Sequence, residues 1–303
     1  MKSHGPFSGH PTPDTLYFMT KKAFQQILGS FPDQGPKDRA YIRLAMDRMW
    51  LTLQHLPKGT GVEHLVDVGS GSGLMGPAYI RMWNYGKVSL LGYDVKSGGS
   101  VERSDDTGRK YSFDTYHANI ELDRFPMDDN AADAVVCTDV LEHLIFDPMF
   151  AMNEICRILK PGGIALIAVP NAVSDEVMSF LLNNRQPGFL RHYISDALID
   201  GRRDLGTVYN LGHFHEYTAP ELVRLAKACG FHVENITAFN YREPEYNDIK
   251  MRMLRNIVRL LWPRSVRLRG EELAGLFRKQ SYTPLDQIAD RYPAPLYSTM
   301  SRE

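Results

Sequence analysis

The stretch from His64 to Gly76 constrains the fold of this chain more than any other and reads HLVDVGSGSGLMG. Leu65 to Val68 is a short, mostly apolar run that predicts a buried parallel strand. Glycines follow at 69, 71 and 73, and the apolar run from Leu74 to Trp83 before Gly86 predicts a helix. A strand, a glycine turn and a helix in this order predict the opening of a β-α-β unit. In such a unit a ligand can approach the backbone at the N-terminus of the helix.

Two ligand-binding patterns fit these glycines. Gly71-x-Gly73-x-x-Gly76 matches the dinucleotide-binding fingerprint. Asp67-x-Gly69-x-Gly71-x-Gly73 matches instead the first motif of class I S-adenosylmethionine-dependent methyltransferases. There the acid accepts hydrogen bonds from the ammonium group of the ligand, and the glycines admit the ligand without a Cβ clash. A glycine-rich turn without any ligand is a third interpretation, so the rest of the chain has to decide.

The composition is that of an ordinary globular protein. Of 303 residues, 43% are hydrophobic and 23% charged, with 35 basic against 36 acidic residues and a net charge of -1. This balance gives no overall field that would attract nucleic acid or an anionic membrane. Residues 1–13 lack the apolar core of a signal peptide, and no apolar run is long enough to span a membrane. We expect the three cysteines to be free thiols: Cys137, Cys156 and Cys229. Free thiols and the absence of these two segments favour a cytoplasmic protein.

Strand and helix patterns alternate along the chain and predict an α/β fold with a doubly wound parallel sheet. Further strands are expected at Lys87–Tyr93, Tyr111–Ala118, Asp133–Cys137, Ile164–Val169, Phe231–Phe239 and Glu272–Arg278. Helices are expected at Asp14–Ser30, Lys37–Leu56, Met149–Lys160, Glu221–Cys229 and, with a basic amphipathic pattern, Ile249–Trp262. Residues 96–110 show little apolar periodicity, so the helix expected between the second and third strands is short or replaced by a loop.

These elements divide the chain into five segments. An N-terminal helical cap (1–60) precedes a ligand-binding core (61–172). This cap either packs on the edge of the sheet or forms a lid over a substrate. Residues 173–215 form an insertion that we expect to be a lid on the substrate side, because its irregular part, Val173 to Gly212, is long for a connector. The C-terminal part of the core (216–280) begins with a Thr218–Glu221 capping box, and an extended tail follows (281–303).

The ordered motifs resemble those of class I S-adenosylmethionine-dependent methyltransferases, and within them the broad group of small-molecule and glycan O-methyltransferases. The matching blocks are Val66–Gly73, Gly92–Asp94, Phe125–Asn130, Val140–Leu144 and Leu159–Gly163. Leu-Lys-Pro-Gly-Gly before an apolar strand has no counterpart in nicotinamide dehydrogenases, which disfavours the dinucleotide interpretation. The resemblance implies a Rossmann-like sheet of seven strands with the last strand antiparallel, and S-adenosylmethionine as the methyl donor.

The resemblance also implies which residues contact the donor. Asp67, Gly69, Ser70, Gly71 and Gly73 would face its methionine part. Asp94, followed by Val95, would hold the ribose hydroxyls. Asn119 and Ile120 would border the adenine, and Thr138 and Asp139 would lie near the sulfonium.

Asp139-x-x-Glu142-His143 follows the fourth strand at the edge where this class of sheet binds ligands. The spacing places all three side chains on one face of a helical turn, and His213 or His215 could complete the set. The cluster is similar to the Glu-x-x-Glu-His metal motif of two methyltransferase families, which act in ubiquinone biosynthesis and on the 2′-hydroxyl of small RNA ends. Three interpretations stay open: a Mg²⁺ or Mn²⁺ site of Asp139, Glu142, His143 and His213, general-base catalysis by His143 or His213 beside Glu142, or a structural role.

The sequence thus predicts an S-adenosylmethionine-dependent methyltransferase that methylates a hydroxyl of a small molecule or glycan. It leaves oxygen, nitrogen and carbon open as the acceptor atom. Two alternatives remain: a metal-assisted RNA 2′-O-methyltransferase, which the neutral net charge disfavours, and a non-catalytic protein of the same fold that binds an adenosine ligand.

Overall fold

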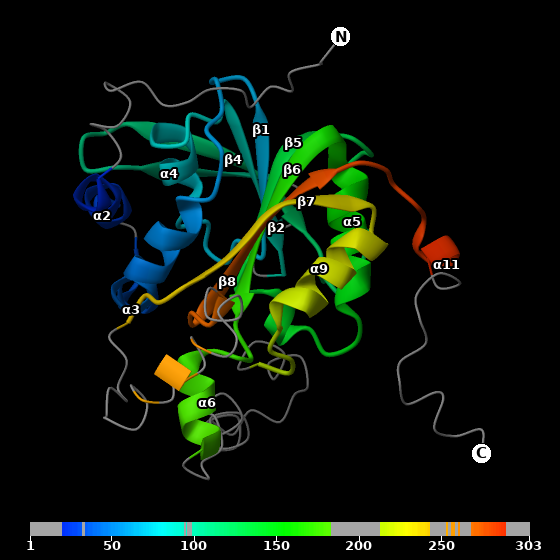
Figure 1. Ribbon diagram of the computed structural model, residues 1–303. Coiled ribbons are helices and arrows are strands. Elements are labelled where there is room, and N and C mark those ends of the chain that lie inside the picture. Colours follow the sequence, from blue (N-terminus) through cyan, green and yellow to red (C-terminus); the bar gives the residue numbers. More distant parts are fainter. Residues whose placement is uncertain are drawn as a thin grey trace, which may run out of the picture.

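The computed structural model describes residues 20–31, 34–93, 95, 99–182, 213–242 and 268–288, with single positions at 253, 256, 257 and 260. The described residues form one eight-stranded sheet in the order β3-β4-β2-β1-β5-β6-β8-β7 (Figure 1). The strands are β1 (His64–Val68), β2 (Lys87–Gly92), β3 (Gly99–Ser104), β4 (Lys110–His117), β5 (Ala132–Thr138), β6 (Leu159–Pro170), β7 (Phe231–Phe239) and β8 (Glu272–Lys279).

The doubly wound sheet expected from the sequence is confirmed. β4, β2, β1, β5 and β6 run parallel, while β8 lies antiparallel between β6 and β7. One strand was not expected: β3 pairs antiparallel with β4 where a short helix or a loop was predicted. Only Arg103 is buried in β3 and most of its residues are exposed, so its sequence lacks the apolar pattern of the central strands.

Helices cover both faces of the sheet (Figure 1). On one face lie α2 (Lys21–Gly29), α3 (Pro36–Leu53) and α4 (Gly76–Arg81), whose apolar side chains share a core with β1 and β2. On the other lie α5 (Pro148–Ile158) and α9 (Ala219–Ala228). Phe24 packs against Trp50 and Trp83, with ring centroids 5.5 Å and 6.1 Å apart, so aromatic contacts hold α2 against α3 and against the turn after α4.

Several predicted element ends are refined by the structure. The capping box of Thr218 and Glu221 is present at α9, and α2 begins after Thr20, whose side chain caps it. Asp14, the expected cap, lies outside the described residues, as does most of the predicted basic helix 249–262. α6 (Asp175–Leu182) opens the insertion, whose remainder to residue 212 is not described.

The described part of the tail, residues 281–288, is not wholly extended as predicted. It contains the one-turn helix α11 (Leu285–Ile288), whose Ile288 is 1% exposed and belongs to the core beside α5 and α9. Among the described helices, none combines the length and apolarity needed to cross a membrane.

The carboxyl ends of the parallel strands meet at one edge of the sheet. The glycine loop, Gly69–Gly73, follows β1 there, Asp139 follows β5 and Asn171 follows β6. Ligands of open α/β sheets bind at this edge, and nearly all the residues expected to be functional lie along it.

Candidate active site

The three motif glycines after β1 all have positive φ angles: 77° at Gly69, 52° at Gly71 and 72° at Gly73. A Cβ at Gly69 would lie 2.2 Å from Val140, and one at Gly73 would lie 2.4 Å from Leu90. A Cβ at Gly71 would meet no atom within 4 Å. The first and third glycines are therefore required by the packing of the protein itself, and Gly71 alone among the three borders open space beside the loop.

Asp67 is the penultimate residue of β1, one residue before Val68 leads into this loop, and is 6% exposed. The hydroxyl of Tyr79, from α4, donates a hydrogen bond to its carboxylate. Burial raises the pKa of Asp67 to about 7, although the Tyr79 hydrogen bond acts in the opposite direction. The buried Ser70 Oγ has no hydrogen-bond partner in the part of the chain that the structure describes. A carboxylate and a hydroxyl at the glycine loop thus suit the amino-acid end of a donor molecule.

The end of β2 lies against the same loop. The Gly69 N–H donates to the Leu91 carbonyl at 2.8 Å, and a Cβ at Gly92 would lie 3.7 Å from the Gly69 Cα. Asp94, the residue expected to hold a ribose, follows Tyr93 but lies outside the described residues. Its neighbour Val95 is buried. The ribose contact therefore stays a prediction, at a strand end that does adjoin the glycine loop.

Asn119 and Ile120 follow β4. The Asn119 Oδ1 accepts from the Glu121 N–H at 3.0 Å, so the oxygen expected to contact adenine is already engaged in a local turn. Ile120 is partly buried against the core. Glu121 is buried and accepts from the backbone N–H groups of Ile145 and Phe146, which fixes the loop after the candidate catalytic residues.

Asp139 follows Thr138 at the end of β5, with a φ of 56° that an aspartate adopts more readily than most residues. Its side chain forms an ion pair with Arg48 of α3, with 3.1 Å between Nη1 and Oδ1. Arg48 also donates to the Tyr41 hydroxyl at 3.2 Å. Burial raises the pKa of Asp139, whereas the Arg48 charge lowers it. Asp139 is therefore paired with the helical cap and does not belong to the cluster expected to bind a metal.

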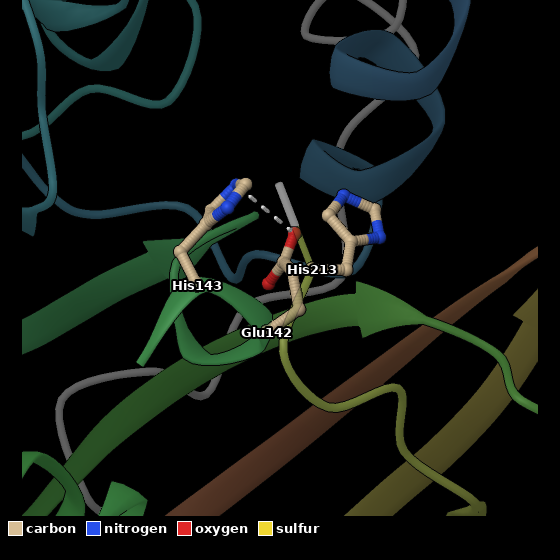
Figure 2. A group of neighbouring side chains, drawn as sticks. All are labelled: Glu142, His143 and His213. Carbon is tan, nitrogen blue, oxygen red and sulfur yellow. Dashed lines mark ion pairs between the residues drawn. The ribbon is translucent and has the colours of Figure 1, made fainter. Parts of the chain in front are cut away.

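Glu142, His143 and His213 do come together, as Figure 2 shows. One ligand atom from each lies within 4.8 Å of the other two. The His143 Nε2 is 3.8 Å from Glu142 Oε1, and the two imidazole centroids are 5.1 Å apart. Nδ1 of His213 contacts Oε1 of Glu216 at 3.2 Å, a contact that orients the ring. The cluster resembles the arrangements in which proteins bind divalent metals or take up protons.

The segment 213–217 is held against residues 141–143 by backbone and side-chain contacts, and the ring of His213 rather than that of His215 joins this cluster. Residues 141–143 form a short 3₁₀ helix, and the Phe214 N–H donates to the Glu142 carbonyl at 2.7 Å. The Tyr217 hydroxyl donates to the Leu141 carbonyl at 3.3 Å, and His215 packs edge-on against Tyr217. His213 is thereby placed over Glu142.

Three carboxyl groups interact with Arg48 at this edge, the partly buried Asp139 and the fully buried Glu142 and Glu272. Glu142 is 1% and Glu272 0% exposed, and none of their carboxylate oxygens has a hydrogen-bond partner among the described residues. Burial raises the pKa of both, and the Asp139 charge adds to the effect.

Sequence reasoning did not identify Arg48, Tyr79 or Glu272 as functional. The sequence does mark Glu272 as unusual, because it is an acid at the start of an otherwise mostly apolar strand. It does not mark Tyr79 or Arg48, since tyrosines and arginines on amphipathic helices usually serve packing or solvation.

Comparisons with known proteins agree with this fold. A profile of the methyltransferase-domain family matches residues 38–236, more than half of the chain. The chain therefore belongs to that family, which confirms the resemblance to class I S-adenosylmethionine-dependent methyltransferases. S-adenosylmethionine is the methyl donor that this membership implies.

Individual relatives are more distant. A probable S-adenosylmethionine-dependent methyltransferase of Mycolicibacterium smegmatis is 32% identical over 122 residues, which cover 40% of this chain and 36% of that protein. The chain thus spans about a third of the length of this curated relative. A chain from the complex of a methyltransferase with its activator from Haloferax volcanii superposes with a TM-score of 0.51 and 17% identity, over 81% of this chain and 94% of that one. This second likeness shows the fold alone.

Proposed function

We propose that the protein transfers the methyl group of S-adenosylmethionine to a hydroxyl of a small molecule or glycan. The observation that carries this proposal is the juxtaposition of Glu142, His143 and His213 at the edge of the sheet that also holds the glycine loop. Methyl transfer from a sulfonium is an in-line displacement, and a hydroxyl acceptor must also lose its proton. The cluster supplies groups that can take up that proton.

His143 is the proposed general base. It lies in the short 3₁₀ helix directly after β5, and its Nε2 faces the Glu142 carboxylate at 3.8 Å. A carboxylate beside an imidazole stabilises the imidazolium that forms when the ring accepts a proton. His213 contacts the Glu216 carboxylate in the same way, so either ring is supported. The proton leaves the acceptor oxygen as its new bond to the methyl carbon forms, and the carbon–sulfur bond of the donor breaks.

The same three side chains fit a divalent metal. Glu142 has two buried oxygens without a hydrogen-bond partner in the described part of the chain, and two imidazoles lie beside it. A set of one carboxylate and two imidazoles favours Mn²⁺ over Mg²⁺, which prefers oxygen ligands. A bound metal would lower the pKa of the acceptor hydroxyl. Asp139, a predicted ligand, is paired with Arg48 and is left out of this proposal.

The donor site is proposed on Asp67, Ser70 and Gly71, with Asp94 at the neighbouring strand end. Titration calorimetry with S-adenosylhomocysteine tests it directly. Heat of binding to the wild type and at least a tenfold weaker constant for Asp67→Ala are expected, because the carboxylate receives the ammonium group of the ligand. Absence of binding at millimolar ligand would overturn the assignment of the donor site.

The chemistry is tested by methyl transfer from radiolabelled S-adenosylmethionine to phenols, sugars and short RNAs with a free 2′-hydroxyl. His143→Gln is expected to retain donor binding and to lose about 100-fold or more in turnover, the usual contribution of a general base. His232→Gln is the control, because His232 is an exposed histidine on β7. Labelling of RNA alone would favour the RNA 2′-O-methyltransferase instead.

Metal binding has its own measurement. Elemental analysis after incubation with Mn²⁺ and desalting is expected to give about one ion per chain, and Glu142→Gln is expected to abolish it. Retention of the ion by Glu142→Gln would show that the cluster is not the metal site.

A further inference from the structure

Glu272 is a buried acid to which neither the sequence motifs nor the proposed chemistry gives a role. It begins β8 and is paired with Pro170 of β6 and Phe239 of β7, at the edge where β6 ends. Its side chain is 0% exposed, and neither carboxylate oxygen has a hydrogen-bond partner within the described ranges. Isolated burial of a carboxylate is strongly unfavourable unless another group compensates it.

The charged groups around Glu272 do not provide that compensation. Asp139, Glu142 and Glu271 are like charges, and Arg48 is the cation that acts on it among the described residues. Arg48, however, already forms its ion pair with Asp139 and its hydrogen bond with Tyr41. Arg48 and Asp139 balance one another, and Glu142 belongs to the cluster with the two histidines. Among the described residues Glu272 therefore has no cation of its own, and its burial beside like charges raises the pKa of its carboxyl.

The geometry points to Glu272 as the subsite for a protonated amino group of the acceptor, which is then a small hydroxyl compound that also carries an amine. This inference rests on the proposed function, because it assigns the substrate class of the same site. An ammonium group has three donors and one positive charge, and so can donate to both carboxylate oxygens and stabilise the ionised form of Glu272. A neutral sugar would satisfy only the hydrogen bonds, and an anionic acceptor would be repelled by the ionised form of Glu272.

An aromatic ring beside Glu272 already contacts cations. The Tyr241 ring lies near it and already faces two guanidinium groups, Arg48 at 5.8 Å and Arg242 at 4.8 Å from the centroid. Aromatic rings attract cations through the negative face of their π system. Because Glu272 is covered, entry of an amine requires neighbouring side chains to shift, and Arg48, whose side chain is 15% exposed, is a charged neighbour that can do so.

The test uses matched pairs of compounds that differ in one amino group: tyramine and 4-ethylphenol, and glucosamine and glucose. Thermal shifts of the full-length protein, with and without S-adenosylhomocysteine, and methyl-transfer rates are measured for each pair. The wild type is expected to bind an amine at least tenfold more tightly than its neutral partner, the range of a charge-assisted hydrogen bond. Glu272→Gln keeps the shape but removes the charge and is expected to abolish this preference.

Glu234→Gln is the matched control, because Glu234 lies on the adjacent strand β7, is partly exposed and is paired with Arg278. It is expected to keep the amine preference of the wild type. Glu272→Asp retains the charge and is expected to keep part of the preference, which separates loss of charge from loss of folding. Equal binding of amine and neutral compounds by the wild type, or an unchanged preference in Glu272→Gln, would overturn the inference.

These outcomes are distinct from failure of the proposed function. If hydroxyl compounds are methylated but the wild type does not prefer the amine of each pair, or Glu272→Gln keeps that preference, the O-methyltransferase proposal stands and the amine subsite is wrong. If amines bind through Glu272 but no methyl group is transferred to any acceptor, the subsite stands and the proposed reaction is wrong.

Discussion

Arg48 of α3 and Asp139 at the end of β5 form an ion pair of 3.1 Å between two side chains that are both about 15% exposed. A second contact runs from the same helix to the glycine loop, where the Ser72 hydroxyl donates to Asp38 at 3.1 Å. α3 therefore touches both the donor side and the acceptor side of the candidate site. Through α3 the helical cap contacts the candidate site and is more than a cover for one face of the sheet.

Removal of Arg48 is expected to destabilise the fold. Arg48→Met would leave the largely buried Asp139 without its cation, a loss that reaches about 3–5 kcal/mol for a fully buried pair. Urea unfolding at neutral pH measures this loss. Lys21→Met provides the control, because Lys21 pairs with Asp47 at 2.6 Å on the exposed surface of the same cap. Such an exposed pair contributes at most about 1 kcal/mol, so equal losses in the two variants would contradict the assigned role of Arg48.

Donor binding is expected to depend on the protonation of Asp67. Burial raises the pKa of this carboxyl to about 7, and only the ionised form attracts the ammonium group of the donor. The affinity for S-adenosylhomocysteine should therefore increase as the pH rises through about 7 and then level off. Asp67→Asn should bind weakly and lack this pH dependence. A wild-type affinity that is constant from pH 6 to pH 8 would contradict the prediction.

The same carboxyl is expected to affect stability with the opposite trend. Its folded pKa lies above the ordinary aspartate value of 3.8, so the folded protein binds this proton more tightly than the unfolded chain. The resulting stabilisation is present below about pH 4 and is lost as the pH rises towards 7. Asp67→Asn should consequently be more stable than the wild type at pH 8, by chemical denaturation, while the difference shrinks as the pH falls.

Loss of the Tyr79 hydroxyl is expected to move the pH profile of donor binding. The hydroxyl lowers the pKa of Asp67, and Tyr79→Phe removes that effect. A hydrogen bond to a charged group contributes about 1.5–3 kcal/mol, which corresponds to an upward move of the midpoint by about 1–2 pH units. Tyr85→Phe is the control, since the equally buried Tyr85 donates to the Pro57 carbonyl instead. Its midpoint should equal that of the wild type.

Alanine substitutions at the motif glycines are expected to separate folding from ligand binding. The methyl group added in Gly71→Ala meets no protein atom. The positive φ alone should lower the free energy of unfolding by about 1–2 kcal/mol, and donor binding should be clearly weaker. Gly69→Ala carries the same φ cost and also drives a methyl group into Val140, so about 1–3 kcal/mol more is expected. Thermal unfolding and calorimetry of both variants test this order. Equal stability of the two would show that Val140 yields to the added methyl.

The amino-acid sequence by itself determined the framework of this protein. The strand, glycine turn and helix at His64–Gly76, the apolar strands and the Thr218–Glu221 capping box are local patterns, and each reflects residues that are near neighbours in the chain. The motif order placed these elements in a doubly wound sheet, which puts the glycine loop and Asp139 at one edge. The sequence also predicted that His213 or His215 would lie near Glu142 at that edge of the sheet.

Only the tertiary structure decided which side chains are partners there. Three contacts depend on how α3, β8 and the segment before α9 pack on the sheet. Arg48 pairs with Asp139, His213 rather than His215 lies over Glu142, and Glu272 is buried among like charges. The sequence also did not predict β3, because this edge strand is defined by its pairing with β4 more than by its own residue pattern. Contacts between distant segments depend on angles and distances of packing that no local pattern encodes, whereas periodicity and capping act within a few residues.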